Sequence, residues 1–400
     1  MNILLAVGMA VILGFIGGKL AKQLKIPMVT GWVIMGVIFG GSILGVFREN
    51  ILQKVDLISD LALGIIAFSI GGELTISNLK RLGKSIAAIV ICESIGAFLL
   101  VSTITFLISH QLYSALILGA VSSATAPAAT VMVINEAKAK GDLTTTIISV
   151  VAIDDAMALI IYAFASSFAK IFISSGATIT LGAVFINPIK EILGSLLIGL
   201  AIGLSISLLS RWMRSRSDFF TLMVGAILLS LGLSARFHLS ALLTNMALGM
   251  TVANFAPRGS RSISNTWQIV TPFLYMAFFC LAGAHLNIKL LPQIGLIGLA
   301  YTGARMAGKI CGASLGAKLS RAPKVVQKYI GFSLFPQVGV ALALAIVVGR
   351  DFGIYGTTGK YLAAMVINIL LFTTVITEIV GPYLTRWALT RAGEVGRRKI

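Results

Sequence analysis

Apolar segments about 20 residues long follow one another along almost the whole chain of 400 residues. A segment of this length and composition can cross the hydrocarbon core of a bilayer as one helix. Apolar residues make up 57% of the sequence and charged residues only 12%, whereas soluble globular proteins carry about 25% charged residues. The sequence therefore predicts an all-α polytopic membrane protein in which lipid surrounds most of the surface.

The distribution of basic residues fits thirteen membrane-spanning helices, with the N-terminus outside and the C-terminus inside. With this topology the inside segments hold 22 lysines and arginines and the outside segments hold 8. Cytoplasmic loops of membrane proteins accumulate such residues. The same rule explains the net charge of +18 without any nucleic-acid partner. The expected spans are residues 2–22, 28–47, 57–75, 85–109, 112–134, 143–168, 186–210, 218–236, 240–256, 267–287, 294–317, 326–349 and 361–389.

Two adjacent aspartates, Asp154 and Asp155, interrupt the apolar run of residues 144–169. A carboxylate at bilayer depth is costly unless it faces a cavity or a partner, so the pair indicates a functional site. Neighbouring residues on a helix point about 100° apart. We therefore expect one aspartate to meet a positive partner and the other to face water, where it holds either a proton or a small cation.

The two halves of the chain resemble each other at an offset near 212 residues, with Gly119 aligned to Gly331. We expect a single membrane domain over residues 1–400, with repeat one at about 2–168, a linking helix at about 186–210 and repeat two at about 218–389. Six helices on either side of one linking helix place the second copy upside down. Inverted repeats of this kind hold their site near the middle of the membrane.

Prolines interrupt expected spans at corresponding places in the two repeats. Pro127 ends the sequence Ser123-Ala-Thr125-Ala-Pro127, and Pro336 follows Phe335 in the twelfth span. Proline removes a backbone donor and breaks a helix locally. Because freed carbonyl groups and half-helix ends can coordinate ions, the two interruptions predict a binding site.

Two basic residues, Arg305 and Lys309, lie one turn apart within the eleventh span. The offset of 212 aligns Glu93 with Arg305, and we expect these two charges to pair. One of the bases is alternatively the partner of Asp154, and Lys309 alternatively extends toward the inner surface. Glu378 lies near the inner end of the last span, and we expect it to be structural.

Four motifs resemble those of the monovalent cation:proton antiporter superfamily, in the branch with paired aspartates. The resemblance covers essentially the whole chain, and the aspartate pair after an interrupted helix is its most specific part. The motifs are Phe68-x-x-Gly-Gly-Glu-Leu74, Ser123-Ala-Thr-Ala-Pro127, Ile153-Asp154-Asp155-Ala156 and Arg305-x-x-x-Lys309.

The resemblance implies two crossing discontinuous helices and a homodimer. It implies that Asp155 is the main carboxylate for the cation and the proton, and that Asp154 is the second member, paired with a base. Thr125 belongs to the unwound stretch beside the ion, close to Ser123. Na⁺ is thus expected at Asp155, Asp154 and Thr125. If Glu93 captures Arg305, Asp154 lacks a fixed salt bridge.

The expected function is secondary active exchange of intracellular Na⁺, or Li⁺, for external H⁺ in a bacterial or archaeal cytoplasmic membrane. The protein is expected to be neither an enzyme nor dependent on a cofactor. A K⁺/H⁺ antiporter on the same scaffold, a non-transporting ion sensor and a sodium/organic-anion symporter are the alternatives. Thirteen residues follow Trp387, so no soluble regulatory domain is expected after the last span.

Overall fold

The computed structural model describes residues 2–24, 27–47, 52, 56–173, 186–212, 215–256, 272–286 and 291–396. Within these ranges the regular elements are helices, apart from one isolated bridge between Gly40 and Phe47. Six of the described helices are long and apolar enough to cross a membrane, and several shorter apolar helices accompany them. The all-α membrane architecture is therefore confirmed, while the count of thirteen spans and the orientation stay predictions.

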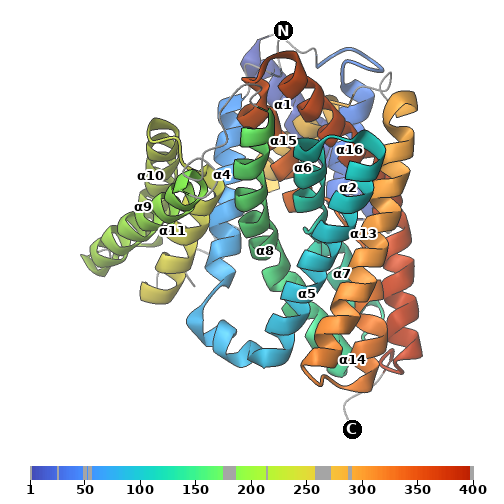
Figure 1. Ribbon diagram of the computed structural model, residues 1–400. Helices are drawn as coiled ribbons and strands as arrows, with labels where there is room; N and C mark the ends of the chain where they lie inside the picture. The colour runs from blue at the N-terminus through green and yellow to red at the C-terminus, as the bar shows by residue number, and fades with distance from the viewer. Residues whose placement is uncertain are drawn as a thin grey trace. The chain divides into compact units, whose positions relative to one another are not determined.

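The chain divides into two compact units, and α1 (Ile3–Gln23) contributes residues to both. The first unit contains a cluster of helices in which α11 packs against both α4 and α9 (Figure 1). Its segments are Met1–Val11, Asn50–Arg81 and Ala177–Phe278. Its named elements are α4 (Asp56–Glu73), α9 (Asn187–Leu209), η3 (Ser210–Trp212), α10 (Arg216–Arg236) and α11 (Ala241–Phe255).

Glycines allow the close packing of helices in this first unit. A Cβ atom at Gly249 would overlap the backbone of Phe68 in α4, and one at Gly199 would overlap Thr244. Small residues let helix backbones approach closely in membranes, where van der Waals contact replaces the hydrophobic effect as the main attraction. The glycines of α9 and α11 thus determine which faces of these helices meet.

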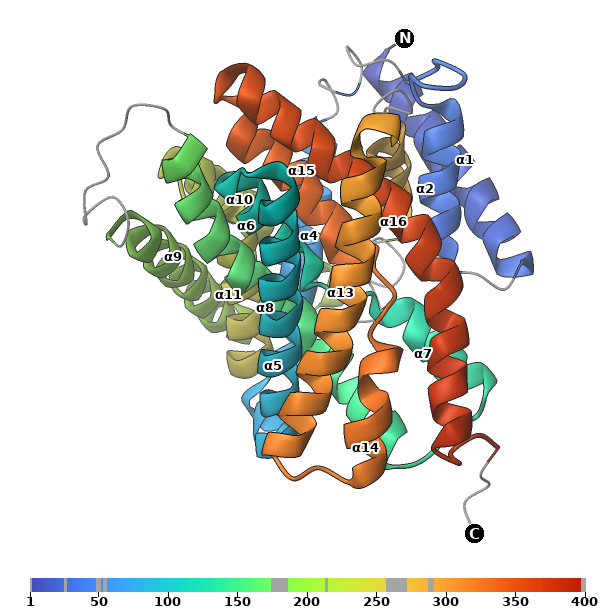
Figure 2. The ribbon, with the colours of Figure 1, turned by 45° about the vertical axis from the view of Figure 1, so that its right-hand side comes forward.

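The second unit contains the aspartate pair and both proline interruptions. Its segments are Ile12–Glu49, Leu82–Gly176 and Phe279–Ile400. Helices α5 and α13 lie side by side in it (Figure 2). Its elements are α2 (Met28–Phe39), α5 (Ile76–Ser109, from residue 82), α6 (Leu112–Ser122), α7 (Pro127–Glu136), α8 (Asp142–Ile173), α13 (Leu291–Leu319), α14 (Lys324–Tyr329), η5 (Ile330–Ser333), α15 (Gly339–Gly353) and α16 (Gly356–Arg391).

A glutamate that follows α16 caps the N-terminus of α8, the helix that carries the aspartates. Glu394 is buried and accepts hydrogen bonds from the backbone N–H groups of Leu143 (2.9 Å) and Thr144 (2.8 Å), and from the Thr144 hydroxyl (2.7 Å). The first N–H groups of a helix have no partner within it, and a negative charge there is favourable. Glu394 therefore ties the end of the chain to the start of α8.

We predict that Glu394→Ala lowers the free energy of unfolding by about 1–2 kcal/mol, because the substitution removes this cap. Glu136→Ala is the matched control, since Glu136 is an exposed acid at the end of α7 and exposed substitutions change stability by less than about 0.5 kcal/mol. Thermal unfolding of the two purified variants measures the difference. Equal melting temperatures would show that the cap does not stabilise α8.

Candidate ion-binding site

The two aspartates lie in α8, between apolar turns of this 32-residue helix. Asp154 is 0% exposed and Asp155 is 9% exposed. Successive side chains on a helix point about 100° apart. The two carboxylates therefore face different neighbours, and Asp155 is the more accessible of the two.

Two helix interruptions meet beside this pair. The first separates α6 from α7 over residues 123–126, and the second separates η5 from α15 over residues 334–338. The backbone N–H of Ala126 donates to the carbonyl of Pro336 at 2.8 Å, and the Gln337 side-chain amide donates to the carbonyl of Val121 at 2.9 Å. The interruptions that Pro127 and Pro336 predicted thus occupy adjacent positions, and each satisfies backbone groups that the other leaves unpaired.

Arg305 holds both interruptions by their carbonyl groups. Its Nε donates to Ser122 at 2.9 Å, its Nη2 to Ala124 at 2.8 Å and its Nη1 to Phe335 at 2.7 Å. The guanidinium is fully buried. A planar group with several fixed donors suits three carbonyls that lie around it. Arg305 therefore stabilises the unwound backbone of both interruptions.

Lys309, one turn further along α13, binds the acids. Its Nζ lies 2.5 Å from Glu93 Oε2 and 3.0 Å from Asp154 Oδ2. It also donates to the Thr125 hydroxyl at 2.8 Å and to the carbonyl of Ser123. All four oxygens belong to buried residues, so a single ammonium group is shared between two carboxylates in a site closed to water.

The predicted pairing of Glu93 with Arg305 is therefore wrong, since Glu93 pairs with Lys309 and Arg305 binds carbonyl groups. The alternative in which Lys309 extends toward the inner surface is wrong too, because its side chain is 0% exposed. The reason lies in the interruptions. Three carbonyls in or next to the interruptions accept hydrogen bonds from the guanidinium, which leaves the acids to the lysine one turn away.

Sequence reasoning missed Ser94, which joins the two acids. Its Oγ lies 2.9 Å from Glu93 Oε1 and 3.0 Å from Asp154 Oδ1. The carbonyl of Ser94 accepts a hydrogen bond from the Ser123 hydroxyl at 3.2 Å. The sequence did contain a signal for this role, because Ser94 directly follows Glu93 inside an apolar span. Ser94 connects α5, α8 and the first interruption.

A ridge of glycines explains how Lys309 reaches Glu93. Gly308, Gly312 and Gly316 lie along one face of α13, and a Cβ atom at any of them would overlap the α5 backbone. At Gly312 the overlap involves Cys92 and Glu93. This small-residue pattern permits close helix approach in membranes. It brings the backbone of α13 against the turn of α5 that holds the acid.

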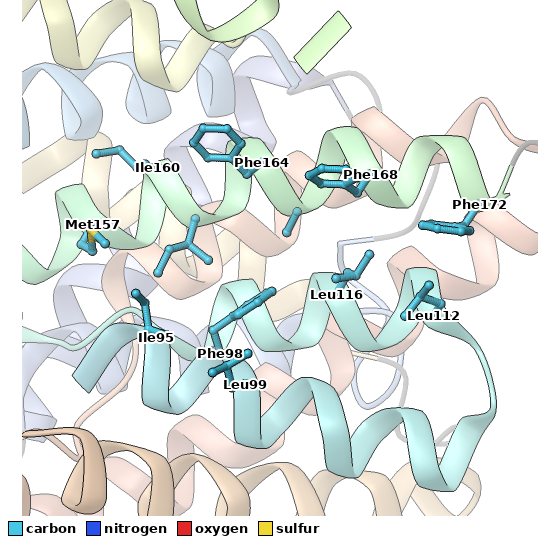
Figure 3. A pocket seen from close by; sticks show the side chains of 12 residues that line it. Ile95, Phe98, Leu99, Leu112, Leu116, Met157, Ile160, Phe164, Phe168 and Phe172 are labelled. Atoms are coloured by element: carbon cyan, nitrogen blue, oxygen red, sulfur yellow. The ribbon is translucent and has the colours of Figure 1, made fainter. Parts of the chain in front are cut away.

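Helix α8 also borders an apolar pocket of about 650 Å³ (Figure 3). Figure 3 shows Phe164, Phe168 and Phe172 spaced along α8, with Leu112 and Leu116 of α6 among the other side chains that line the pocket. The lining side chains carry neither a charge nor a hydroxyl group. Such a surface offers no oxygen ligand to replace the hydration shell of a small cation. The ion site is therefore expected among the polar groups around Asp154 and Asp155.

Comparison with known proteins identifies the family and the fold. A family model described as "Sodium/hydrogen exchanger, transmembrane" matches residues 8–391. The sodium proton antiporter MjNhaP1 from Methanocaldococcus jannaschii at pH 8 shares the fold, with a TM-score of 0.80 and 18% identity over 99% of this chain and 100% of that chain. The structural match agrees with the all-helical fold described above.

Three curated relatives match part or most of the chain. The probable Na⁺/H⁺ antiporter GerT of Bacillus cereus is 27% identical over 38% of this chain and 40% of that protein. The Na⁺/H⁺ antiporter NhaP of Pseudomonas aeruginosa is 24% identical over 44% and 42%. The matched segments thus span about two fifths of these two proteins. The ammonium/H⁺ antiporter subunit AmhT of Alkalihalophilus pseudofirmus is 22% identical over 92% of each chain.

The resemblance to cation:proton antiporters is confirmed, and so is the expectation of an integral membrane protein of the bacterial or archaeal kind. The matching family consists of transporters rather than enzymes. The chain belongs to the sodium/hydrogen exchanger family of membrane proteins.

Proposed function

We propose that the protein is a secondary antiporter that exchanges intracellular Na⁺ for external H⁺ at Asp155. The charge balance of the site supports this proposal. Glu93, Asp154 and Asp155 would carry three negative charges if ionised, and Lys309 and Arg305 carry two positive ones. One buried negative charge is left, and it needs either one proton or one monovalent cation.

The two aspartates have different roles in this proposal. Asp154 is fully buried and shares the Lys309 ammonium group and the Ser94 hydroxyl with Glu93. Asp155 is the more accessible carboxylate. We therefore assign the exchanged ion to Asp155, and to Asp154 the role of a second ligand that Lys309 neutralises when the cation has left.

Na⁺ binds oxygen atoms, as hard cations do. Carboxylate oxygens of Asp155 and Asp154 and the Thr125 hydroxyl supply this chemistry, with Ser123 next to them in the unwound segment. Binding of the cation makes proton binding to the same carboxylate less favourable in free energy, because two positive charges in a low-dielectric site repel each other. Competition for one charge thus couples the two ions without a separate coupling device.

Transport also requires that the site open to each side of the membrane in turn, and we propose alternating access with the crossed interruptions at its centre. Irregular backbone at membrane depth occurs where it lines a cavity or is buried in protein. A homodimer, implied by the resemblance to cation:proton antiporters, is proposed as the functional assembly. Both proposals rest on the family and on the position of the interruptions.

NH₄⁺ and K⁺ are the competing substrates. AmhT, named as a subunit of an ammonium/H⁺ antiporter, matches 92% of this chain. Lys309 Nζ already occupies a position bounded by Asp154, Thr125, Ser123 and Glu93, which is the environment that an ammonium ion prefers. The same oxygens suit Na⁺, so the ion must be identified by experiment.

The test uses purified protein in liposomes that contain a pH-sensitive dye. Na⁺, Li⁺, K⁺ and NH₄⁺ are added in turn, with protein-free liposomes as the control for passive movement of ammonia. We expect Na⁺ and Li⁺ to drive outward proton movement. If only K⁺ or only NH₄⁺ drives proton movement, that ion is the substrate in place of Na⁺. If none of the four cations drives proton movement, the antiporter proposal is contradicted.

A further inference from the structure

Glu378 in α16 is a buried carboxyl group that the proposed exchange does not use. Its side chain is 0% exposed. The face of α16 that carries it packs against the second interruption, because the Thr374 hydroxyl donates to the carbonyl of Gln337 at 2.9 Å and Gly381 lies against Pro336. Glu378 thus lies between these two contacts, one turn from Thr374. Sequence reasoning placed it at the inner end of a span as a structural residue, which did not predict this burial.

The hydrogen bonding of Glu378 is incomplete. Its Oε2 accepts one bond, from the Thr30 hydroxyl of α2, at a distance of 3.3 Å. Among the described residues, Oε1 has no hydrogen-bond partner. The Gln337 backbone also contacts the carboxyl group, and the positive charge of Arg305 interacts with it electrostatically. A buried carboxylate normally accepts several hydrogen bonds or a direct ion pair.

Arg305 does not supply that ion pair. Its Nε, Nη1 and Nη2 donate to the carbonyls of Ser122, Phe335 and Ala124, and within the described part of the chain no guanidinium nitrogen forms an ion pair with Glu378. Lys309 is shared by Glu93 and Asp154. If Glu378 were ionised, it would add a second uncompensated negative charge to the one at the aspartate pair. A carboxylate buried without a partner costs several kcal/mol, about as much as breaking a buried ion pair.

We propose that Glu378 is a second proton-binding site, separate from the aspartate pair, and that it carries a proton in this conformation. The proton removes the uncompensated charge and turns one oxygen into a donor. The proposal goes beyond the exchange at Asp155 and is independent of which cation is transported. Loss of this proton would place a negative charge that interacts with the guanidinium of Arg305, which holds both interruptions.

Infrared difference spectroscopy of the full-length purified protein tests this directly, because a protonated carboxylic acid has a C=O stretching band that a carboxylate lacks. We expect a band at neutral pH that disappears in Glu378→Gln and persists in Asp155→Asn. Thr30→Val should shift the frequency of the same band, because it removes the hydrogen bond that the Thr30 hydroxyl donates to the group. Asp142→Asn, which changes an exposed acid at the start of α8, should leave the band unchanged.

A spectrum of Glu378→Gln that superimposes on that of the wild type would overturn the proposal, since Glu378 would then be ionised throughout. If Glu378→Gln does not fold, Thr30→Val decides: an unchanged band would also contradict the assignment. The outcome is separable from that of the transport assay. A protein that moves no Na⁺ can still show the Glu378 band, and an active antiporter can lack it.

Discussion

Replacing Asp155 by asparagine is expected to abolish cation-driven proton movement. The substitution keeps the size of the side chain but removes one negative charge, which leaves Glu93, Asp154, Lys309 and Arg305 balanced. The site then needs neither a proton nor a cation. Charged ligands of this kind contribute about 3 kcal/mol, so transport should fall about 100-fold, to the level of protein-free liposomes.

The matched control for this experiment is Asp142→Asn, which removes an exposed acid from the first turn of the same helix. We expect it to retain wild-type exchange. A second measurement separates binding from transport: wild-type protein should release protons when Na⁺ is added in detergent, and Asp155→Asn should release none. Vigorous Na⁺-driven proton movement by Asp155→Asn would refute the assignment of the exchanged ion.

Lys309→Met is expected to be the most destabilising single substitution in the site. It preserves most of the length of the side chain but leaves Glu93 and Asp154 buried without their shared cation. Breaking a buried ion pair by removing one partner costs about 3–5 kcal/mol. The purified variant should therefore unfold at a much lower temperature than the wild type, and exchange should be lost.

A double-mutant cycle identifies the cause of this loss. Adding Glu93→Gln to Lys309→Met removes one of the stranded charges, so the double variant should regain part of the lost stability. Lys318→Met, an exposed lysine on the same helix, is the control and should behave like the wild type. Additive effects of Glu93→Gln and Lys309→Met would mean that the two side chains do not interact in the protein.

The elements that the sequence predicted well are those with a strong local signal. The apolar run around Asp154 and Asp155 forms one long helix. The prolines at positions 127 and 336 lie at helix interruptions because proline lacks the N–H that a continuous helix needs. Such features depend on the residue itself and its nearest neighbours. They do not require knowledge of how distant helices pack.

The partners of the buried charges could not be predicted in the same way. Arg305 and Lys309 lie one turn apart on α13, and the alignment of the repeats alone favoured Arg305 as the partner of Glu93. The outcome depends on the unwound carbonyls beside Arg305 and on the glycines that bring α13 against α5. The structural role expected for Glu378 stays a prediction, and its burial depends on α2 and on the second interruption, which are distant in the sequence.

The hydrogen bonds between the two interruptions have a consequence for motion. Ala126 is joined to Pro336, Gln337 to Val121, and Arg305 to both segments. Shifting one segment alone would strand amide and carbonyl groups in a region without water to replace them. We therefore expect the two interruptions to move as one rigid body with α13, and the hinges of a conformational cycle to lie outside them.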